Sequence, residues 1–182
     1  MPMGIFSFLK SSAYENEEDA ISAIIDVTCF GIGTSNNRDK STMERVLNSI
    51  EKQVNPGTGA RLLYWLAIGW RNYTAWHVKG DEKKLYLEKA VNRFKDAFEK
   101  SISELPVLLP QKNKHNSAYL DQISIAIDLA MLLMDYKVRD FEQAEKYLKF
   151  VYDNTDDYEP CFCAYLELFL DRDEAEAASK IA

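Results

Sequence analysis

Two aspartates lie in otherwise apolar stretches of the chain and could serve acid–base chemistry. Asp26 stands within Ile-Ile-Asp-Val, and Asp128 stands within Ile-Ala-Ile-Asp-Leu-Ala-Met. Apolar surroundings raise the pKa of a carboxyl group, which is what a general acid or base near neutral pH requires. The same pattern is typical of a carboxylate at the one solvated edge of a buried helix. We therefore predict that the protein is not an enzyme, and keep a helical enzyme using either carboxylate as an alternative.

Side chains that bind metals are few and badly spaced for a metal site. The chain has two histidines, His77 and His115, and three cysteines. Cys161 and Cys163 have one residue between them, whereas cysteine pairs in zinc sites usually have about two to four. An odd number of cysteines also provides no disulfide framework and favours a reducing compartment. We expect no metal and no cofactor.

The segment from Asn55 to Arg61 leads into a predicted helix and contains two glycines, as phosphate-binding turns do. It lacks the preceding strand and the Gly-Lys-Ser/Thr ending of such a turn. The interpretation that we adopt is a turn between two helices.

Aromatic residues gather in one segment, which makes that segment the leading candidate for a partner-binding surface. All three tryptophans lie between Trp65 and Trp76, and aromatic side chains contribute much of the energy at interfaces because each removes a large area from water. The alternative is that both faces of this helix are buried between neighbouring layers. We expect one face to be exposed and to form a groove with the inward face of the fifth helix as its opposite wall. The predicted partner-binding residues are Trp70, Arg71, Tyr73, His77, Leu129, Leu133 and Tyr136.

The net charge of -7 lies entirely after Tyr152, because acidic and basic side chains are equal in number before it. An acidic end repels phosphate backbones and attracts cationic partners, so we expect no nucleic-acid binding. It is also typical of the solvated face of terminal helices. A second hypothesis is therefore a small acidic protein of the immunity or inhibitor type that neutralises a cationic toxin or effector. Its acidic patch would comprise Asp153, Asp156, Asp157 and Asp171.

Length and composition place the chain among ordinary globular proteins. Its 182 residues fit one domain, which we expect at residues 13–182 after a tail at residues 1–12. The apolar run in the tail, from Gly4 to Leu9, is too short for a signal peptide or a membrane span. We expect a cytoplasmic protein with no integral membrane association. Its oligomeric state stays open, and a homo-oligomer is one option.

Helices are the elements that must position these residues, because helix signals recur from end to end of the chain. Acidic first turns, capping boxes and prolines in first turns mark eight helices. Joined by short turns, they would form four antiparallel pairs in an all-α fold, with residues 106–116 as the one loose linker. Their predicted first residues or caps are Glu17, Ser41, Thr58, Asp81, Ser117, Asp140, Pro160 and Asp171.

The third and fourth predicted helices resemble a tetratricopeptide repeat. That family has a large residue and then Leu-Gly in its first helix, and Ala, an aromatic residue and Ala in its second. The matching residues here are Trp65, Ile68, Gly69, Ala90, Phe94 and Ala97. The resemblance implies a right-handed superhelical stack of helix pairs. It also implies that the first helix of each pair lines a groove that receives a protein or peptide segment.

Overall fold

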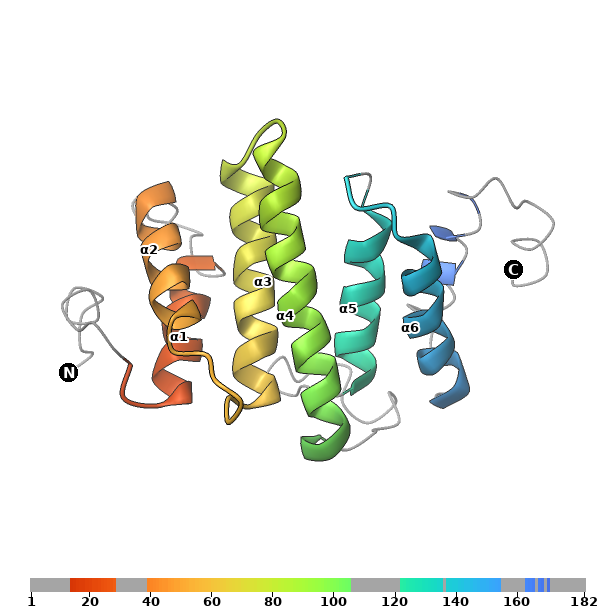
Figure 1. The fold of residues 1–182 in the computed structure, drawn as a ribbon, viewed down its shortest axis with the longest axis horizontal. Coiled ribbons are helices and arrows are strands. Elements are labelled where there is room, and N and C mark those ends of the chain that lie inside the picture. The colour runs from red at the N-terminus through yellow and green to blue at the C-terminus, as the bar shows by residue number, and fades with distance from the viewer. Residues whose placement is uncertain are drawn as a thin grey trace. The chain divides into compact units, whose positions relative to one another are not determined.

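The computed structural model describes residues 14–28, 39–105, 122–135 and 137–154, together with 163–165, 167, 168 and 170. Six α-helices and no strand occur in these residues (Figure 1), which confirms the predicted all-helical class. Residues 163–165, 167, 168 and 170 are also helical, whereas the predicted eighth helix lies outside the described residues. The six helices are α1 (Glu17–Thr28), α2 (Lys40–Glu51), α3 (Ala60–His77), α4 (Glu82–Glu104), α5 (Gln122–Met134) and α6 (Phe141–Asn154).

The contacts within the chain group its residues into two compact units, residues 1–93 and residues 94–182, with the boundary inside α4. Each unit is described by itself below. The single domain over residues 13–182 stays a prediction, and the expected linker at 106–116 lies outside the described residues.

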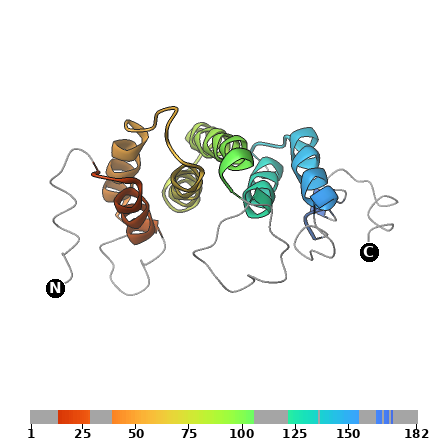
Figure 2. The same cartoon turned by 90° about the horizontal axis from the view of Figure 1, so that it is seen from below.

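In the first unit, α1, α2 and α3 all contact one another, and seen end-on they form a triangle (Figure 2). The three helices meet at Gly69 of α3. A Cβ atom on Gly69 would lie 2.4 Å from Cδ2 of Leu47 in α2 and 3.3 Å from Cγ2 of Ile24 in α1. Ile24, Leu47 and Leu66 are fully buried around this point. A larger residue here would have to displace the Leu47 and Ile24 side chains, which lie in the close-packed core.

Helices α3 and α4 form an antiparallel hairpin whose turn includes Gly80 (Figure 1). Gly80 has φ 68°, a left-handed conformation that glycine adopts at no steric cost. The first part of α4 belongs to the first unit, where the Tyr86 ring lies 5.2 Å from the Tyr73 ring between centroids. The predicted Gly-Asp turn between the two helices is therefore present.

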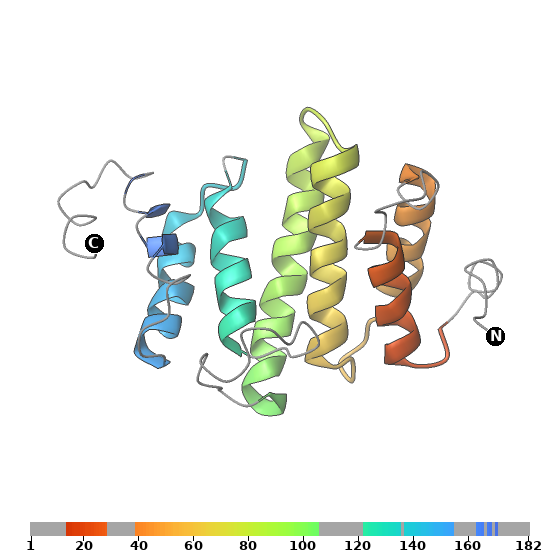
Figure 3. The same cartoon turned by 180° about the vertical axis from the view of Figure 1, so that it is seen from behind.

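In the second unit, α5 and α6 form an antiparallel pair (Figure 3). Phe98, from the last part of α4, contacts this pair edge-on, with ring centroids 5.1 Å from Tyr147 and 5.0 Å from Phe150. Buried Gln122 donates from Nε2 to the carbonyl oxygens of Ser101 and Leu105, at 3.0 and 2.8 Å. The Ser101 carbonyl also accepts from the Leu105 N–H at 2.9 Å, and the bonds from Gln122 join the start of α5 to the end of α4.

Two predicted helix starts are wrong by one or two residues. The N-cap of α2 is Asp39, whose carboxylate accepts from the backbone N–H of Thr42 at 2.9 Å, and not Ser41. Hydrogen bonds from Ser41 and Thr42 lower the pKa of Asp39. An ionised carboxylate therefore caps α2, where the predicted capping box would have used the Ser41 hydroxyl.

The predicted cap of the third helix is also displaced, because the N-cap of α3 is Gly59 and not Thr58. The Thr58 hydroxyl oxygen instead accepts from the backbone N–H of Asn55 at 3.0 Å and closes the turn. The prediction at α6 is confirmed: Asp140 Oδ1 accepts from the backbone N–H of Gln143 at 3.2 Å.

Candidate functional site

The exposed aromatic face predicted on the third helix is not present. Trp70 and Tyr73 are both 0% exposed. The reason is Tyr86 of α4, which covers both rings with centroid separations of 5.7 Å to Trp70 and 5.2 Å to Tyr73. Arg71 and His77 are half-buried. The alternative in which this face is buried between layers describes Trp70 and Tyr73 correctly, and neither ring is available to a partner.

The opposite wall of the predicted groove is also buried. Leu129 and Leu133 on α5 are 0% and 1% exposed, because α6 packs against α5 in the second unit. Tyr136 lies outside the described residues. Trp76 is 41% exposed and Trp65 is half-buried, and neither is among the predicted partner-binding residues.

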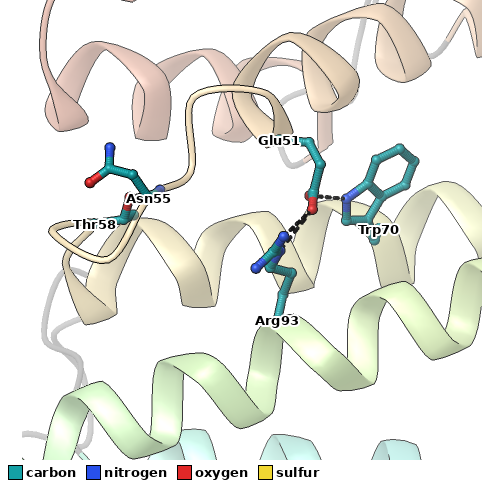
Figure 4. Close-up of polar contacts among 5 residues, drawn as sticks. All are labelled: Glu51, Asn55, Thr58, Trp70 and Arg93. Atoms are coloured by element: carbon teal, nitrogen blue, oxygen red, sulfur yellow. Dashed lines mark hydrogen bonds and ion pairs between the residues drawn. The ribbon is translucent and has the colours of Figure 1, made fainter.

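The carboxylate of Glu51 explains why Trp70 is held inward. Trp70 donates from Nε1 to Glu51 Oε2 at 3.0 Å, and Arg93 donates from Nε to Glu51 Oε1 at 2.8 Å (Figure 4). The ammonium group of Lys89 lies 4.6 Å from the centroid of the Trp70 ring. Glu51 therefore links α2, α3 and α4 through charge-assisted hydrogen bonds, and both of its oxygens are engaged. We call this group of four residues the Glu51 cluster.

A second, half-buried polar contact involves Tyr86, whose ring packs on Trp70 of the Glu51 cluster. Tyr86 donates from its hydroxyl to Glu44 Oε1 at 3.2 Å. Burial first, and then the Glu44 carboxylate, raise the pKa of both Tyr73 and Tyr86 above the ordinary value of 10.0. His77 Nε2 is buried with no hydrogen-bond partner among the described residues. Both tyrosines are therefore held neutral, and their rings serve packing.

The described part of the first unit has a pocket of about 230 Å³ where α1 begins, α2 ends and the turn to α3 runs. Its apolar residues Ala20, Ile50 and Leu62 are buried, whereas Asn16 and Glu17 are exposed. The pocket therefore has an apolar base and a polar mouth. We call it the end pocket, and its lining residues are Tyr14, Asn16, Glu17, Ala20, Ile50, Gln53, Asn55, Gly57, Thr58 and Leu62.

Hydrogen bonds between distant parts of the chain join residues that line the end pocket. The Tyr14 backbone N–H donates to Gln53 Oε1 at 3.1 Å, and the Gly59 N–H donates to Glu17 Oε1 at 2.7 Å. Burial is the larger effect on the Tyr14 hydroxyl and raises its pKa, while the Arg45 charge lowers it. The first bond joins the segment before α1 to the segment after α2, across 39 residues of sequence, and the second joins the first turn of α1 to the N-cap of α3, across 42 residues.

The segment from Asn55 to Arg61 forms the predicted turn between two helices, and its backbone N–H groups at Gly57, Thr58 and Gly59 are engaged within the protein. The Gly57 N–H donates to Asn55 Oδ1 at 2.8 Å, and the Thr58 N–H donates to the Asn55 carbonyl at 2.9 Å. The Gly59 N–H at the start of α3 is taken by Glu17. The carboxylate of Glu17 thus occupies the position where an anionic ligand would bind a helix N-terminus.

Neither of the two candidate catalytic carboxylates lines the end pocket. Asp26 is half-buried, and burial raises its pKa, while Asp128 is also half-buried. In the described ranges, no group of three or more histidine, cysteine or carboxylate side chains is placed to hold a metal ion. The enzyme alternative therefore stays a prediction.

The predicted acidic patch falls mostly on residues that the structure does not describe. Asp153, at the end of α6, is exposed and pairs with Lys149 at 3.1 Å. Asp156, Asp157 and Asp171 lie outside the described residues. Among the described helices, none is both long and apolar enough to cross a membrane.

Comparisons of the chain with protein-family models, with curated proteins and with solved structures find no match. The function therefore has to be argued from the geometry of the end pocket and from the packing that surrounds it.

Proposed function

We propose that the protein is a non-enzymatic interaction module that binds a segment of a protein or peptide partner, and that the end pocket takes part in this binding. The observation that carries the proposal is the pocket itself, with a buried base of Ala20, Ile50 and Leu62 beneath a polar mouth. Recognition sites commonly combine an apolar surface with a few placed polar groups.

The size of the end pocket favours part of a larger partner over a free cofactor. Its volume of about 230 Å³ is below the range of about 300–1,000 Å³ that is usual for pockets of drug-sized ligands. One side chain of a bound segment fits such a volume, while the rest of the segment would lie on the surface around the mouth. This also replaces the predicted aromatic groove, whose residues Trp70 and Tyr73 are buried.

The packing of the first unit supports a scaffold of the tetratricopeptide kind. In such a stack, each helix contacts its own partner and the first helix of the next pair. Here α1 contacts both α2 and α3, and Gly69 lies at the crossing, at the small position that the resemblance assigns to it. We propose a tetratricopeptide-like arrangement on these grounds.

Selection from a library of displayed random peptides, with the purified full chain as bait, tests this function. Ala20→Met places a longer side chain in the end pocket. Ala23→Met is the matched control, because Ala23 is a buried residue of the same helix outside the lining. We expect the selected peptides to bind wild type and Ala23→Met, and to lose at least about ten-fold in affinity for Ala20→Met.

Both variants are first compared with wild type by thermal unfolding. If Ala20→Met does not fold, Leu62→Ala provides the second arm, since a larger pocket should shift the selected peptides towards bulkier side chains. Peptides that bind all variants equally, or a failure to select any peptide, would contradict the proposed function.

A further inference from the structure

We propose that the end pocket accepts a cationic side chain, the ammonium group of a lysine or the guanidinium group of an arginine, from the bound segment. This inference rests on the proposed function and specifies the chemistry of the same pocket. It goes beyond that function because the pocket alone would equally accept an apolar side chain.

The first argument is that the backbone donors at the mouth are already used within the protein. The N–H groups of Gly57, Thr58 and Gly59 donate to Asn55 Oδ1, to the Asn55 carbonyl and to Glu17 Oε1. The amide group of Asn55 donates to the Gln53 carbonyl at 3.0 Å, and that of Gln53 donates to the Ser49 carbonyl at 3.0 Å. Carbonyl and carboxylate oxygens can each accept more than one hydrogen bond, so the mouth retains acceptors for a ligand that donates.

The second argument is the charge of Glu17. Oε1 of this exposed carboxylate accepts from Gly59 at 2.7 Å, so its second oxygen, Oε2, has accepting capacity at the mouth. The neighbouring Glu18 pairs with Arg61 at 2.8 Å. An anion would be repelled by Glu17 and would find the start of α3 already occupied, whereas an ammonium or guanidinium group would form a charge-assisted hydrogen bond.

The third argument is the shape of the pocket beneath this charge. Lysine and arginine carry long apolar stems and place only their heads in polar surroundings. Ala20, Ile50 and Leu62 offer the stem a buried apolar base. Tyr14 adds an aromatic ring to the lining, and aromatic rings attract cations. A volume of about 230 Å³ suits one long side chain.

Of the cationic groups near the pocket, Arg61 is already paired with an acidic side chain. Arg61 pairs with Glu18, and the Arg45 charge acts on the Tyr14 hydroxyl, whose pKa it lowers against the larger effect of burial. The first turn of α1 carries Glu17, Glu18 and Asp19. The first turn of α1 therefore places further negative charge beside Glu17, which favours a cationic ligand.

The test uses amino-acid probes followed by NMR titration of the full chain. The probes are Nα-acetyl-lysine methylamide, its norleucine counterpart of similar length without charge, and n-butylamine as a free amine. We expect the lysine probe to bind at least about ten-fold more tightly than the norleucine probe, since hydrogen bonds to charged groups exceed this difference in free energy. Equal binding of these two probes would overturn the inference.

Glu17→Gln and Glu18→Gln form the matched pair of variants. Glutamine at 17 keeps an oxygen that can accept from Gly59 but removes the charge, and Glu18 pairs with Arg61 outside the lining. We expect Glu17→Gln to weaken the lysine probe about ten-fold and Glu18→Gln to change it less than about two-fold. Equal effects of the two variants would contradict a specific role for Glu17.

The source of the cation is decided by the third probe. Tighter binding of the lysine probe than of n-butylamine supports a polypeptide ligand, and the reverse order contradicts it in favour of a free amine. Failure of the inference is distinguishable from failure of the proposed function. Selected peptides that depend on the pocket but carry no lysine or arginine would end the inference alone, whereas an absence of selected peptides would end the proposed function.

Discussion

The Glu51 cluster and the end pocket lie in the same unit, and each is organised by one glutamate. Glu51 is half-buried, and each of its oxygens accepts from a neighbouring helix, Oε2 from Trp70 and Oε1 from Arg93. Glu17 is exposed, and one of its oxygens accepts from Gly59 beside a pocket. The comparison indicates that a carboxylate with both oxygens engaged fixes helices in place, whereas one with remaining capacity at a pocket can serve a ligand.

The largest expected effect comes from the helix crossing on which both regions depend. Gly69→Val should lower the free energy of unfolding by about 3 kcal/mol, because the new side chain would collide with Leu47 and Ile24. Chemical denaturation measures this change. Ala75→Val, at an exposed position of the same helix, is the control and should cost about 0.5 kcal/mol. Similar losses for the two variants would contradict the close crossing.

Replacing each glutamate by alanine tests directly whether Glu51 and Glu17 differ in their contribution to stability. Glu51→Ala should lower the free energy of unfolding by about 2 kcal/mol, because Trp70 and Arg93 both lose their acceptor. Glu17→Ala should cost less than about 1 kcal/mol, because Glu17 is exposed. Urea denaturation of both variants provides the measurement. A larger loss of stability for Glu17→Ala than for Glu51→Ala would contradict this difference between the two carboxylates.

Alkaline pH tests the burial of the aromatic side chains next to the Glu51 cluster. The pKa of Tyr73 and of Tyr86 is raised above 10.0 in the folded protein, whereas the unfolded chain ionises its tyrosines near that value. The unfolded state therefore loses protons first, and stability should fall as the pH rises above about 10. Ultraviolet absorbance of tyrosinate, followed with circular dichroism and compared with the Tyr73→Phe and Tyr86→Phe variants, should show that these two side chains ionise only as the helices unfold. Their ionisation in the folded protein would contradict this burial.

The smallest expected effect concerns the cation on the Trp70 ring. Lys89→Met keeps an unbranched side chain but removes the ammonium group that lies 4.6 Å from the ring centroid. We expect a loss of about 0.5–1 kcal/mol in the free energy of unfolding. Lys84→Met, at an exposed position of α4, serves as the reference and should be nearly neutral. An equal loss of stability in Lys84→Met would contradict a stabilising cation–π contact between Lys89 and Trp70.

Much of the helical framework could be predicted from local sequence patterns. The acidic first turn of α1 and the Asp140 cap of α6 are local signals, and both predictions are confirmed. The caps of α2 and α3 were misplaced because a nearby residue provides the cap of α2, and because the Thr58 side chain is used within the turn before α3. Asp39 lies two residues before Ser41, and Thr58 has a turn partner in Asn55.

The candidate site could not be predicted from local sequence patterns, because its contacts join residues that are far apart in the sequence. Trp70 was expected at the surface. Its burial depends on Glu51, which lies 19 residues before it, and on Tyr86, which lies on the next helix. Glu17 was interpreted only as a favourable charge at a helix start, and its bond to Gly59 joins residues 42 apart. The periodicity of one helix contains no information about a contact with another element. Tertiary packing therefore determined the burial of Trp70 and the bond from Gly59 to Glu17.

The measurement that tests the central claim most directly is a map of backbone amide shifts in the ¹⁵N-labelled protein on addition of a selected peptide. The account predicts that the largest shifts occur at the end pocket, at Ala20, Gly57 and Gly59, and that Glu51 and Trp70 respond little. Shifts confined to the exposed end of α3 around Trp76, with none at the end pocket, would contradict the account.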